Sequence, residues 1–249
     1  MMFRTPNDSP TESNDFYNEA YTQGFTTEMP SPTQLEKLLS VNFANTEKDY
    51  SRYVALLEAT GVKPGAKLFD FGCSWGYGSY QLRRVGFDVT SSEVSRPRGG
   101  YAKEKLGVNL VDFDTASEQG KGQYDVFFSS HVIEHVPSPS VIIAKAMPML
   151  KPGGLFIALF PNGSENCRAV DPSWSKYWGE SHPNMIDEVF LNRIFGGQPR
   201  LYASESADQT KNHRRHDVEA FSVFRNAAYP GALYADDLGH YEMYFATRK

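Results

Sequence analysis

The sequence is poor in cysteine, with only Cys73 and Cys167 among its 249 residues. Two cysteines cannot form the disulfide framework of a small secreted domain. The chain also lacks an N-terminal apolar segment typical of a signal peptide, and its longest apolar run, at residues 155–160, is too short to cross a bilayer. Positive charge is not in excess, because the net charge is −5, which argues against general affinity for nucleic-acid phosphates. These absences predict a cytoplasmic protein whose partner is neither a membrane nor a nucleic acid.

The most informative feature that is present is a glycine-rich turn behind a short apolar strand. The strand covers residues 67–71, and a helical segment begins near residue 79. The glycines between them are Gly72, Gly76 and Gly78. In a doubly wound sheet such a turn brings bare backbone close to a nucleotide-like ligand. Glu93 lies 21 positions after Gly72, at the end of a second apolar stretch, where a carboxylate can bind a ribose diol. The turn and the acid together predict an adenosine-containing cofactor.

The spacing of the glycines distinguishes between cofactors. The dinucleotide fingerprint G-x-G-x-x-G needs glycine where this chain has Ser74 and Tyr77. The pattern that is present, with Ser74 in place of a middle glycine, resembles motif I of class I S-adenosylmethionine-dependent methyltransferases, acid-x-G-x-G-x-G. Three further signals follow in the order of that family. They are an acid after a third strand at residues 108–111, YDVFFSSHVIEHV at residues 124–136, and LKPGG at residues 150–154.

This resemblance covers about residues 50–162 and implies a fold and a cofactor. The implied fold is α/β, a Rossmann-like doubly wound seven-stranded sheet with an antiparallel last strand. N-terminal helices and insertions would form a substrate cap. Strands and helices alternate from about residue 66 to residue 160, which also indicates parallel pairing. The implied cofactor is S-adenosyl-L-methionine, and the implied activity is transfer of its methyl group by in-line displacement.

The domain organisation follows from composition. Residues 1–15 are polar and contain two prolines, which predicts a flexible tail, and residues 16–249 are predicted to form a single methyltransferase domain. The expected cap elements are residues 16–50, 163–184 and 207–240. Helices are predicted at residues 31–39, 46–60 and 185–195, and late strands at residues 200–206 and 241–248. The basic segment 211–216 is either a solvated loop or an anion-binding element of the substrate site.

The family resemblance implies contacts to the methionine and ribose parts of the cofactor. The backbone of Gly72 and Gly76 would meet the methionine portion, and Asp70 would orient it, directly or through water. Cys73 is a small residue that suits close approach of the ligand, and we interpret it as a packing residue rather than a nucleophile. Glu93 would accept both ribose hydroxyls in charge-assisted hydrogen bonds; a helix cap is the alternative role for this acid.

The adenine contacts are implied in the same way. Asp114 matches the family acid that accepts from the adenine amino group, with Phe113 against the ring, and Asp112 is the alternative acid. Either aspartate could instead be an ordinary turn residue. Ser130, which ends the predicted fourth strand, completes the expected cofactor site.

Methyl transfer itself requires little acid–base chemistry from the protein. Methyl transfer from a sulfonium mainly requires an acceptor held on the axis of the methyl group with water excluded. A base is needed only for a hydroxyl, an acidic carbon or a charged amine. His131, just past the fourth strand, is the first candidate for base or acceptor positioner, and His182 is the second. A packing or cofactor-backbone role for His131 is the alternative.

The motif H-x-x-E-H at residues 131–135, with His182 downstream, has residue types suited to a metal site. It is also the inverted metalloprotease motif, but here it follows a strand end inside a methyltransferase-like series. A closer resemblance is to ubiquinone-pathway O-methyltransferases and small-RNA terminal methyltransferases, in which E-x-x-E-H helps to bind a divalent ion. His131 stands where those families carry the first glutamate. We therefore predict no metal and keep a metal-assisted O-methyltransferase as an alternative.

Two further functions compete with this reading. A short-chain dehydrogenase would need a Tyr-x-x-x-Lys pair after the fourth or fifth strand, whereas Tyr101 and Lys105 follow the second strand. A methyltransferase-like cofactor-binding protein without catalysis is the other. The acceptor is predicted to be a small polar molecule, sugar-like or ring-bearing, because the cap segments place aromatic residues among polar ones. The same aromatics could form a packed lid. They are Tyr17, Tyr21, Phe25, Trp174, Tyr177 and Trp178.

Overall fold

The computed structural model describes residues 1–5, 9–20, 28–179, 182–205, 218–226, 229 and 231–249. Its strands are β1 (Met2–Phe3), β2 (Lys67–Phe71), β3 (Asp88–Ser92), β4 (Tyr124–Ser130), β5 (Leu150–Pro161), β6 (Asn184–Met185), β7 (Arg200–Glu205), β8 (Ala232–Tyr234) and β9 (Glu242–Arg248). Its α-helices are α1 (Pro10–Asp15), α2 (Pro32–Ser40), α3 (Ser51–Ala59), α4 (Tyr77–Arg84), α5 (Arg96–Leu106), α6 (Phe113–Gln119), α7 (Pro139–Met149), α8 (Glu165–Val170), α9 (Glu188–Phe195) and α10 (Val218–Arg225). A π-helix, η1 (Phe16–Ala20), and a 3₁₀-helix, η2 (Trp174–Tyr177), complete the described elements.

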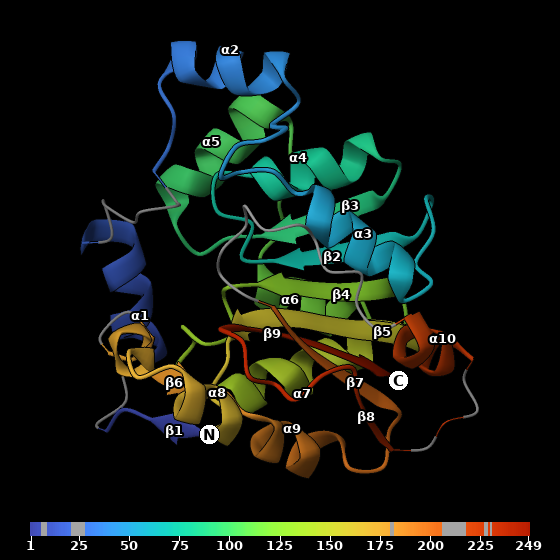
Figure 1. The fold of residues 1–249 in the computed structure, drawn as a ribbon. Coiled ribbons are helices and arrows are strands. Elements are labelled where there is room, and N and C mark those ends of the chain that lie inside the picture. The colour runs from blue at the N-terminus through green and yellow to red at the C-terminus, as the bar shows by residue number, and fades with distance from the viewer. Residues whose placement is uncertain (6–8, 21–27, 180–181, 206–217, 227–228, 230) are drawn as a thin grey trace.

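A seven-stranded sheet in the order β3-β2-β4-β5-β9-β7-β8 forms the centre of the molecule (Figure 1). The strands β3, β2, β4 and β5 are parallel, and β9 pairs antiparallel with both β5 and β7. The predicted α/β sheet with an antiparallel last strand is confirmed. Parallel neighbours need a crossover connection, usually a helix, which explains why the chain alternates strand and helix through this half of the sheet.

One predicted strand differs in detail. Residues 108–111 form only a parallel bridge between Ser91 and Leu110, because the chain turns at once into α6 at Asp112. The seventh strand is instead β8, which pairs parallel with β7 and lies within residues 207–240, predicted to be a cap element. The basic segment 211–216 lies outside the described residues.

Two apolar layers sandwich the sheet. Successive strand residues point to opposite faces, so that Leu68 packs in the layer of α3, α4 and α10 while Phe69 packs in the layer of α6, α7 and α9. A third cluster, which contains Phe43 and Trp75, joins α2 and α5 to the glycine turn. Each layer buries aromatic rings, which supply large apolar area.

The N-terminal residues, predicted to be a flexible tail, contain regular structure. Met2 and Phe3 pair with β6, and Ser9 closes a capping box at the start of α1. In Figure 1 α1 lies beyond the arrowheads of β2, β3 and β4. The N-terminal segment therefore borders the edge of the sheet at which these strands end.

Two predicted helices begin later than their sequence pattern suggests. The helix expected at 46–60 starts at Ser51, because Asp49 accepts from the Ser51 amide and organises the preceding turn. The helix expected at 185–195 starts at Glu188, because Asn184 and Met185 pair with β1 and Asp187 then caps α9. Pairing and capping decide both boundaries.

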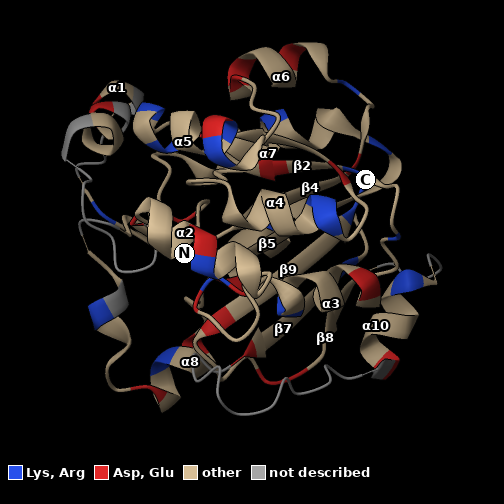
Figure 2. Cartoon of the chain, turned by 90° about the horizontal axis from the view of Figure 1, so that it is seen from above, with Lys and Arg blue, Asp and Glu red and all other residues tan. Residues whose placement is uncertain are grey.

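Charged residues of both signs are interspersed along the elements seen in Figure 2. For example, α5 carries basic residues in its last turn, whereas α6 has an acid in its first turn and no base in its last. Among the described residues, no helix combines the length and apolar character needed to span a bilayer.

Candidate active site

The carboxyl ends of three parallel strands bring the predicted site residues to one edge of the sheet. Asp70 is in register with Ser91 of β3 on one side and with Phe128 of β4 on the other. The residues that follow these strands, Glu93 after β3 and His131 after β4, therefore flank the glycine turn. Ligands of open α/β sheets bind at such a switch point, where the connections from neighbouring parallel strands lead to opposite sides of the sheet.

The glycine turn adopts a conformation that explains its sequence. Gly72, Ser74 and Gly76 all have left-handed backbone, with φ of +79°, +53° and +86°. Ser74 is the residue that replaces the middle glycine of the family motif, and it accepts a conformation that side chains disfavour. A Cβ added at Gly72 would lie 2.4 Å from a methyl group of Val132. Glycine is thus required here by the packing of the loop after β4.

The amides of the turn are already engaged. Those of Gly72 and Cys73 both donate to the carbonyl of Ser92, and that of Gly76 donates to the carbonyl of Cys73. The turn is thereby fixed to the end of β3. The backbone of Gly72 and Gly76 stays the part of the turn predicted to meet the methionine portion. The Cys73 thiol is buried, and burial raises its pKa well above the ordinary value, which agrees with packing rather than nucleophilic chemistry.

Glu93 fixes the turn from the other side. One carboxylate oxygen accepts from the Ser74 amide at 2.7 Å, and the other accepts from the Ser95 amide at 2.8 Å. Burial raises the pKa of this carboxyl, while the two amides oppose the rise. Each oxygen retains a second lone pair, so the same carboxylate can also accept from a diol.

Asp70 is buried at the start of a chain of hydroxyl groups. Its Oδ2 accepts from Ser79 Oγ at 2.6 Å, and Ser79 Oγ in turn accepts from Ser91 Oγ at 3.0 Å. Burial raises the pKa of Asp70 from 3.8 to about 6. The hydroxyls of Ser74 and Ser92 are also buried and have no hydrogen-bond partner among the described residues. Buried polar groups normally have partners, so this edge of the sheet fits a polar ligand such as the predicted cofactor.

The two candidate adenine acids differ in their partners. Asp112 caps α6 by accepting from the Thr115 amide at 2.8 Å, and it follows directly on residues 108–111. Asp114 is exposed, and its carboxylate lies 2.7 Å from Nζ of Lys145 on α7. Phe113 is half-buried, with its ring centroid 4.7 Å from that of Phe71. Asp112 is exposed as well, and it differs from Asp114 in lying directly at the end of residues 108–111.

Ser130 meets a residue that the sequence analysis did not select. The side chain of Tyr50, immediately before α3, lies near Ser130; burial, then the neighbouring Tyr77 and Asp70, raise the pKa of Tyr50 well above its ordinary value, while Ser130 opposes the rise. A Cβ at Gly78 would lie 2.4 Å from the Tyr50 ring. Gly78 thus allows Tyr50 to pack on α4. The glycine at position 78 is a sequence signal for such a close contact, but it does not identify Tyr50 as the partner.

His131 is held in an unusual conformation by two carboxylates. Its backbone is left-handed, with φ of +54°, and its amide donates to the carbonyl of Leu159 at 2.8 Å. Nε2 lies 2.5 Å from Oε1 of Glu242, and Nδ1 lies 3.6 Å from Oε1 of Glu134. Burial alone would lower the pKa of His131, but the two carboxylates outweigh it and hold the pKa well above the ordinary value.

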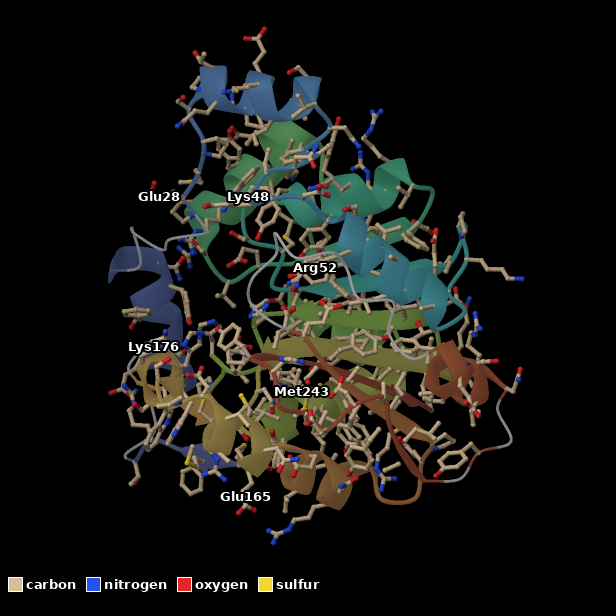
Figure 3. The ribbon with its side chains drawn as sticks, viewed as in Figure 1. Glu28, Lys48, Arg52, Glu165, Lys176 and Met243 are labelled. Atoms are coloured by element: carbon tan, nitrogen blue, oxygen red, sulfur yellow. The ribbon has the colours of Figure 1, made fainter. Side chains whose placement is uncertain are left out.

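Arg52, the second residue of α3, supports Glu242 from the opposite side. Its guanidinium lies 2.7 Å from Oε2 of Glu242 and donates to the Tyr53 hydroxyl at 2.6 Å. Figure 3 labels Arg52 on the α3 side of the sheet. Neither Arg52 nor Glu242 could be selected from the sequence, because 190 positions separate them and no local motif contains either.

His182 joins the site through Glu134 and His135. Glu134 is fully buried, and its carboxylate accepts no hydrogen bond from a described residue, although His135 approaches Oε1 to 3.7 Å. The His135 and His182 rings lie 4.6 Å apart, and one ligand atom from each of these three residues lies within 4.8 Å of the others. Burial would raise the pKa of Glu134, but the neighbouring imidazoles lower it. A buried carboxylate beside two imidazoles has the donor set of a divalent-ion site.

Comparison with known proteins agrees with this geometry. The family model of the methyltransferase domain matches residues 43–198, more than half of the chain. The ubiquinone biosynthesis O-methyltransferase of Caulobacter vibrioides is 32% identical over 120 residues, which are 45% of this chain and 48% of that protein. The enzyme of the same name from Bordetella avium is 29% identical over 104 residues, 39% of this chain and 43% of that protein. The chain thus spans about half the length of the curated relatives it matches.

A solved structure extends the likeness to nearly the whole chain. Phosphoethanolamine N-methyltransferase 2 of Haemonchus contortus, in complex with S-adenosyl-L-methionine, superimposes with a TM-score of 0.59 at 15% identity. The match covers 99% of this chain and 61% of that protein, and it shows a shared fold. With the glycine turn, the strand order and the family match in agreement, the chain belongs to the class I S-adenosylmethionine-dependent methyltransferase family.

Proposed function

We propose that this protein transfers the methyl group of S-adenosylmethionine to an oxygen atom of a small polar acceptor, ring-bearing or sugar-like, in the cytoplasm. The observation that supports it most directly is the meeting of cofactor-type groups and His131 at one edge of the sheet, between β2 and β4. The two curated relatives are named O-methyltransferases, which supports oxygen as the accepting atom.

The positions of the described side chains support a set of cofactor contacts. Glu93 holds the ribose diol, and Asp70 orients the methionine portion together with the hydroxyls of Ser74 and Ser92. Phe113 borders the adenine, and Asp112 accepts from its amino group, in preference to Asp114. When bound, S-adenosylmethionine supplies a methyl group that is already activated by its sulfonium.

The residues of this chain position the acceptor. Tyr50 and Ser130 close the methionine side of the site and keep water away from it. His131, which Glu134 and Glu242 keep protonated, binds and positions the acceptor oxygen, while His182 lies farther along the same surface and orients the acceptor. Tyr17 of η1 packs edge-to-face on His135 at 6.3 Å, so the N-terminal segment borders the acceptor side. Holding the acceptor in line while excluding water is the main source of rate in such a displacement.

Two measurements test this function. Calorimetry with S-adenosylhomocysteine and with NAD should show binding of the first only. A screen with radiolabelled S-adenosylmethionine against quinols, sugar nucleotides and RNA should then label a small molecule. Binding without any transfer would favour a cofactor-binding protein without catalysis. Label in RNA alone would overturn the choice of acceptor.

A second candidate function, a metal-assisted O-methyltransferase, is favoured by the cluster of Glu134, His135 and His182. The buried carboxylate of Glu134 lacks a hydrogen bond from the described residues, and a divalent ion would satisfy it. The ion would bind an acceptor oxygen and lower the pKa of its hydroxyl. Equilibrium dialysis with Mg²⁺, Mn²⁺ or Zn²⁺ should then show one bound ion that His182→Ala releases. His240→Ala, a histidine outside the cluster, is the matched control. Absence of metal-dependent transfer would remove this candidate.

A further inference from the structure

Lys48 lies on a segment that one buried amide fixes to the helix after the glycine turn. The Gln81 side chain, in α4, donates to the Lys48 carbonyl at 2.8 Å and accepts from the Tyr50 amide at 3.0 Å. Gln81 is buried, so residues 48–50 are held against α4. These hydrogen bonds join residues 33 and 31 positions apart in the sequence. The position of Lys48 is therefore set by tertiary contacts rather than by a local motif.

The ammonium of Lys48 lies over the first residue of α4. Its Nζ is 5.5 Å from the centroid of the Tyr77 ring, and Tyr77 directly follows Gly76 of the turn. Tyr77 is also near Asp70, because burial raises the pKa of its hydroxyl and the charge of Asp70 adds to that rise. In the view of Figure 3, Lys48 lies above Arg52. The ammonium is thus close to the turn whose backbone is predicted to meet the methionine portion of the cofactor.

The methionine end of S-adenosylmethionine carries an ammonium and a carboxylate. Asp70 provides a negative charge that suits the ammonium. The same charge disfavours the carboxylate, and Glu93 is near enough for its own charge to help raise the pKa of Asp70 after burial itself. A charge taken out of water is costly unless an opposite charge or hydrogen bonds compensate it. The methionine side of the site therefore needs a cation.

We propose that the ammonium of Lys48 binds the carboxylate of the methionine portion, above the start of α4. This inference rests on the proposed cofactor contacts and adds the residue that recognises the charged end of the cofactor. Burial lowers the pKa of Lys48, while Glu47 and Glu28 oppose the fall, so an anion at this place would offset the cost of burying the ammonium. The partial positive charge at the start of α4 favours the same negative group.

Two arginines near the site are less suited to this role. Arg52 is already paired with Glu242 at 2.7 Å and with Glu205 at 3.4 Å. Arg98, in α5, is near Glu93, because its charge opposes the rise that burial causes in the pKa of that carboxyl. Glu93 is the proposed ribose contact, so Arg98 lies on the ribose side of the turn. Neither arginine is placed to serve the methionine side.

The test compares S-adenosylhomocysteine with S-adenosyl-3-thiopropylamine, which is the same compound without its carboxylate. In calorimetry with the full chain, the wild type should prefer S-adenosylhomocysteine by about 10- to 100-fold, the range of a charged hydrogen bond. Lys48→Met keeps an apolar side chain over Tyr77 and removes the charge. It should lose that preference, because its affinity for S-adenosylhomocysteine falls by the same factor. Its affinity for the amine should stay within about threefold, which also shows that the variant folds.

Three variants control this comparison. Lys48→Arg should restore most of the preference, because it restores the charge. Lys63→Met, at an exposed lysine between α3 and β2, is the matched control and should behave like the wild type. Loss of the preference in Arg98→Met, with the preference kept in Lys48→Met, would assign the carboxylate to the arginine and overturn the proposal.

The remaining outcomes separate this proposal from the proposed function. A wild type that binds both compounds equally would overturn the role of Lys48 and leave the cofactor site in place. A wild type that binds neither compound would refute the cofactor site itself, and the role of Lys48 with it. If Lys48→Met binds neither compound, Lys48→Gln is measured in its place. Loss of both affinities in that variant as well would make Lys48 a structural residue and overturn the proposal.

Discussion

Replacing Asp70 by asparagine should stabilise the protein at neutral pH while weakening its cofactor site. The Asp70 side chain is only 3% exposed, and burial raises its pKa from 3.8 to about 6. The hydrogen bond from Ser79 opposes that rise, and the negative charge of Glu93 adds to it. A rise of about two pH units means that ionising this carboxyl in the folded protein costs roughly 3 kcal/mol more than in the unfolded chain.

The sign of the pH dependence follows from the direction of the shift. Because the folded pKa lies above the unfolded one, the folded protein binds the proton more tightly, and stability from this group is complete below about pH 4. It is lost as pH rises through about 6. Between pH 4.5 and 7.5 the loss should be about 2 kcal/mol, and Asp70→Asn, which cannot ionise, should not show it.

Urea unfolding at pH 4.5, 5.5, 6.5 and 7.5 measures this difference. The free energy of unfolding of Asp70→Asn should exceed that of the wild type by an amount that grows with pH by about 2 kcal/mol. Asp88→Asn, an exposed aspartate at the start of β3, should keep the wild-type slope. Calorimetry should show that Asp70→Asn binds S-adenosylhomocysteine about 10- to 150-fold more weakly, the loss expected for a charged hydrogen bond. A pH slope equal to that of the wild type would refute the reasoning on burial, and unchanged affinity would remove Asp70 from the cofactor site.

The remaining predictions concern single contacts of the site. Glu93→Gln should weaken S-adenosylhomocysteine binding by about 1.5–3 kcal/mol in calorimetry, because the charged acceptor for the diol is lost; a change below about threefold in Kd would leave Glu93 only the role of fixing the turn. Gly78→Ala should lower the free energy of unfolding by about 1–3 kcal/mol, since the new methyl group must displace the Tyr50 ring, and a urea midpoint like that of the wild type would contradict this contact. In the same calorimetry, Asp112→Asn should weaken S-adenosylhomocysteine binding more than Asp114→Asn does. The reverse order would favour Asp114, the acid that matches the family motif, as the adenine contact.

The sequence was sufficient to predict the half of the fold whose signals are local. The strand at 67–71, the glycine turn and the carboxylate at 93 lie within about 27 residues, and parallel pairing then places Glu93 beside the turn. The antiparallel last strand followed from the family resemblance and is confirmed. Contacts within one strand–turn–helix unit join residues close in sequence, so the local sequence pattern is enough to predict them.

The differences arise where tertiary contacts override local pattern. Residues 108–111 have the composition of a strand but reach the sheet at only one bridge before Asp112 begins α6. Residues 1–15 are polar, yet β1 and α1 form because β6 offers a strand to pair with and Ser9 offers a cap. The composition of residues 1–15 cannot indicate that a pairing strand lies about 180 residues away.

The acceptor side could be predicted only in part, for a physical reason. The place of His131 just past the fourth strand predicts its role, and His182 is the second candidate, but the groups that contact His131 come from distant segments. Arg52 comes from α3 and Glu242 from β9, and the sheet brings them together because β9 inserts between β5 and β7. Charge complementarity between such segments is invisible until the topology is known.

This division between the two halves of the site has a consequence for specificity. The proposed contacts to the methionine and ribose of the cofactor come from one contiguous unit, residues 67–95, in which Glu93 accepts from the Ser74 amide of the turn and Asp70 accepts from the Ser79 hydroxyl of α4. We expect a change at Glu93 to disturb both the turn and cofactor binding. The proposed acceptor half is assembled from α3, the loop after β4, the segment before β6 and the start of β9, which are joined by side-chain contacts rather than by shared backbone. We expect substitutions there to change which acceptor is methylated without changing cofactor binding. The acceptor should therefore be sought with variants of these four segments, whose affinity for S-adenosylhomocysteine should stay that of the wild type.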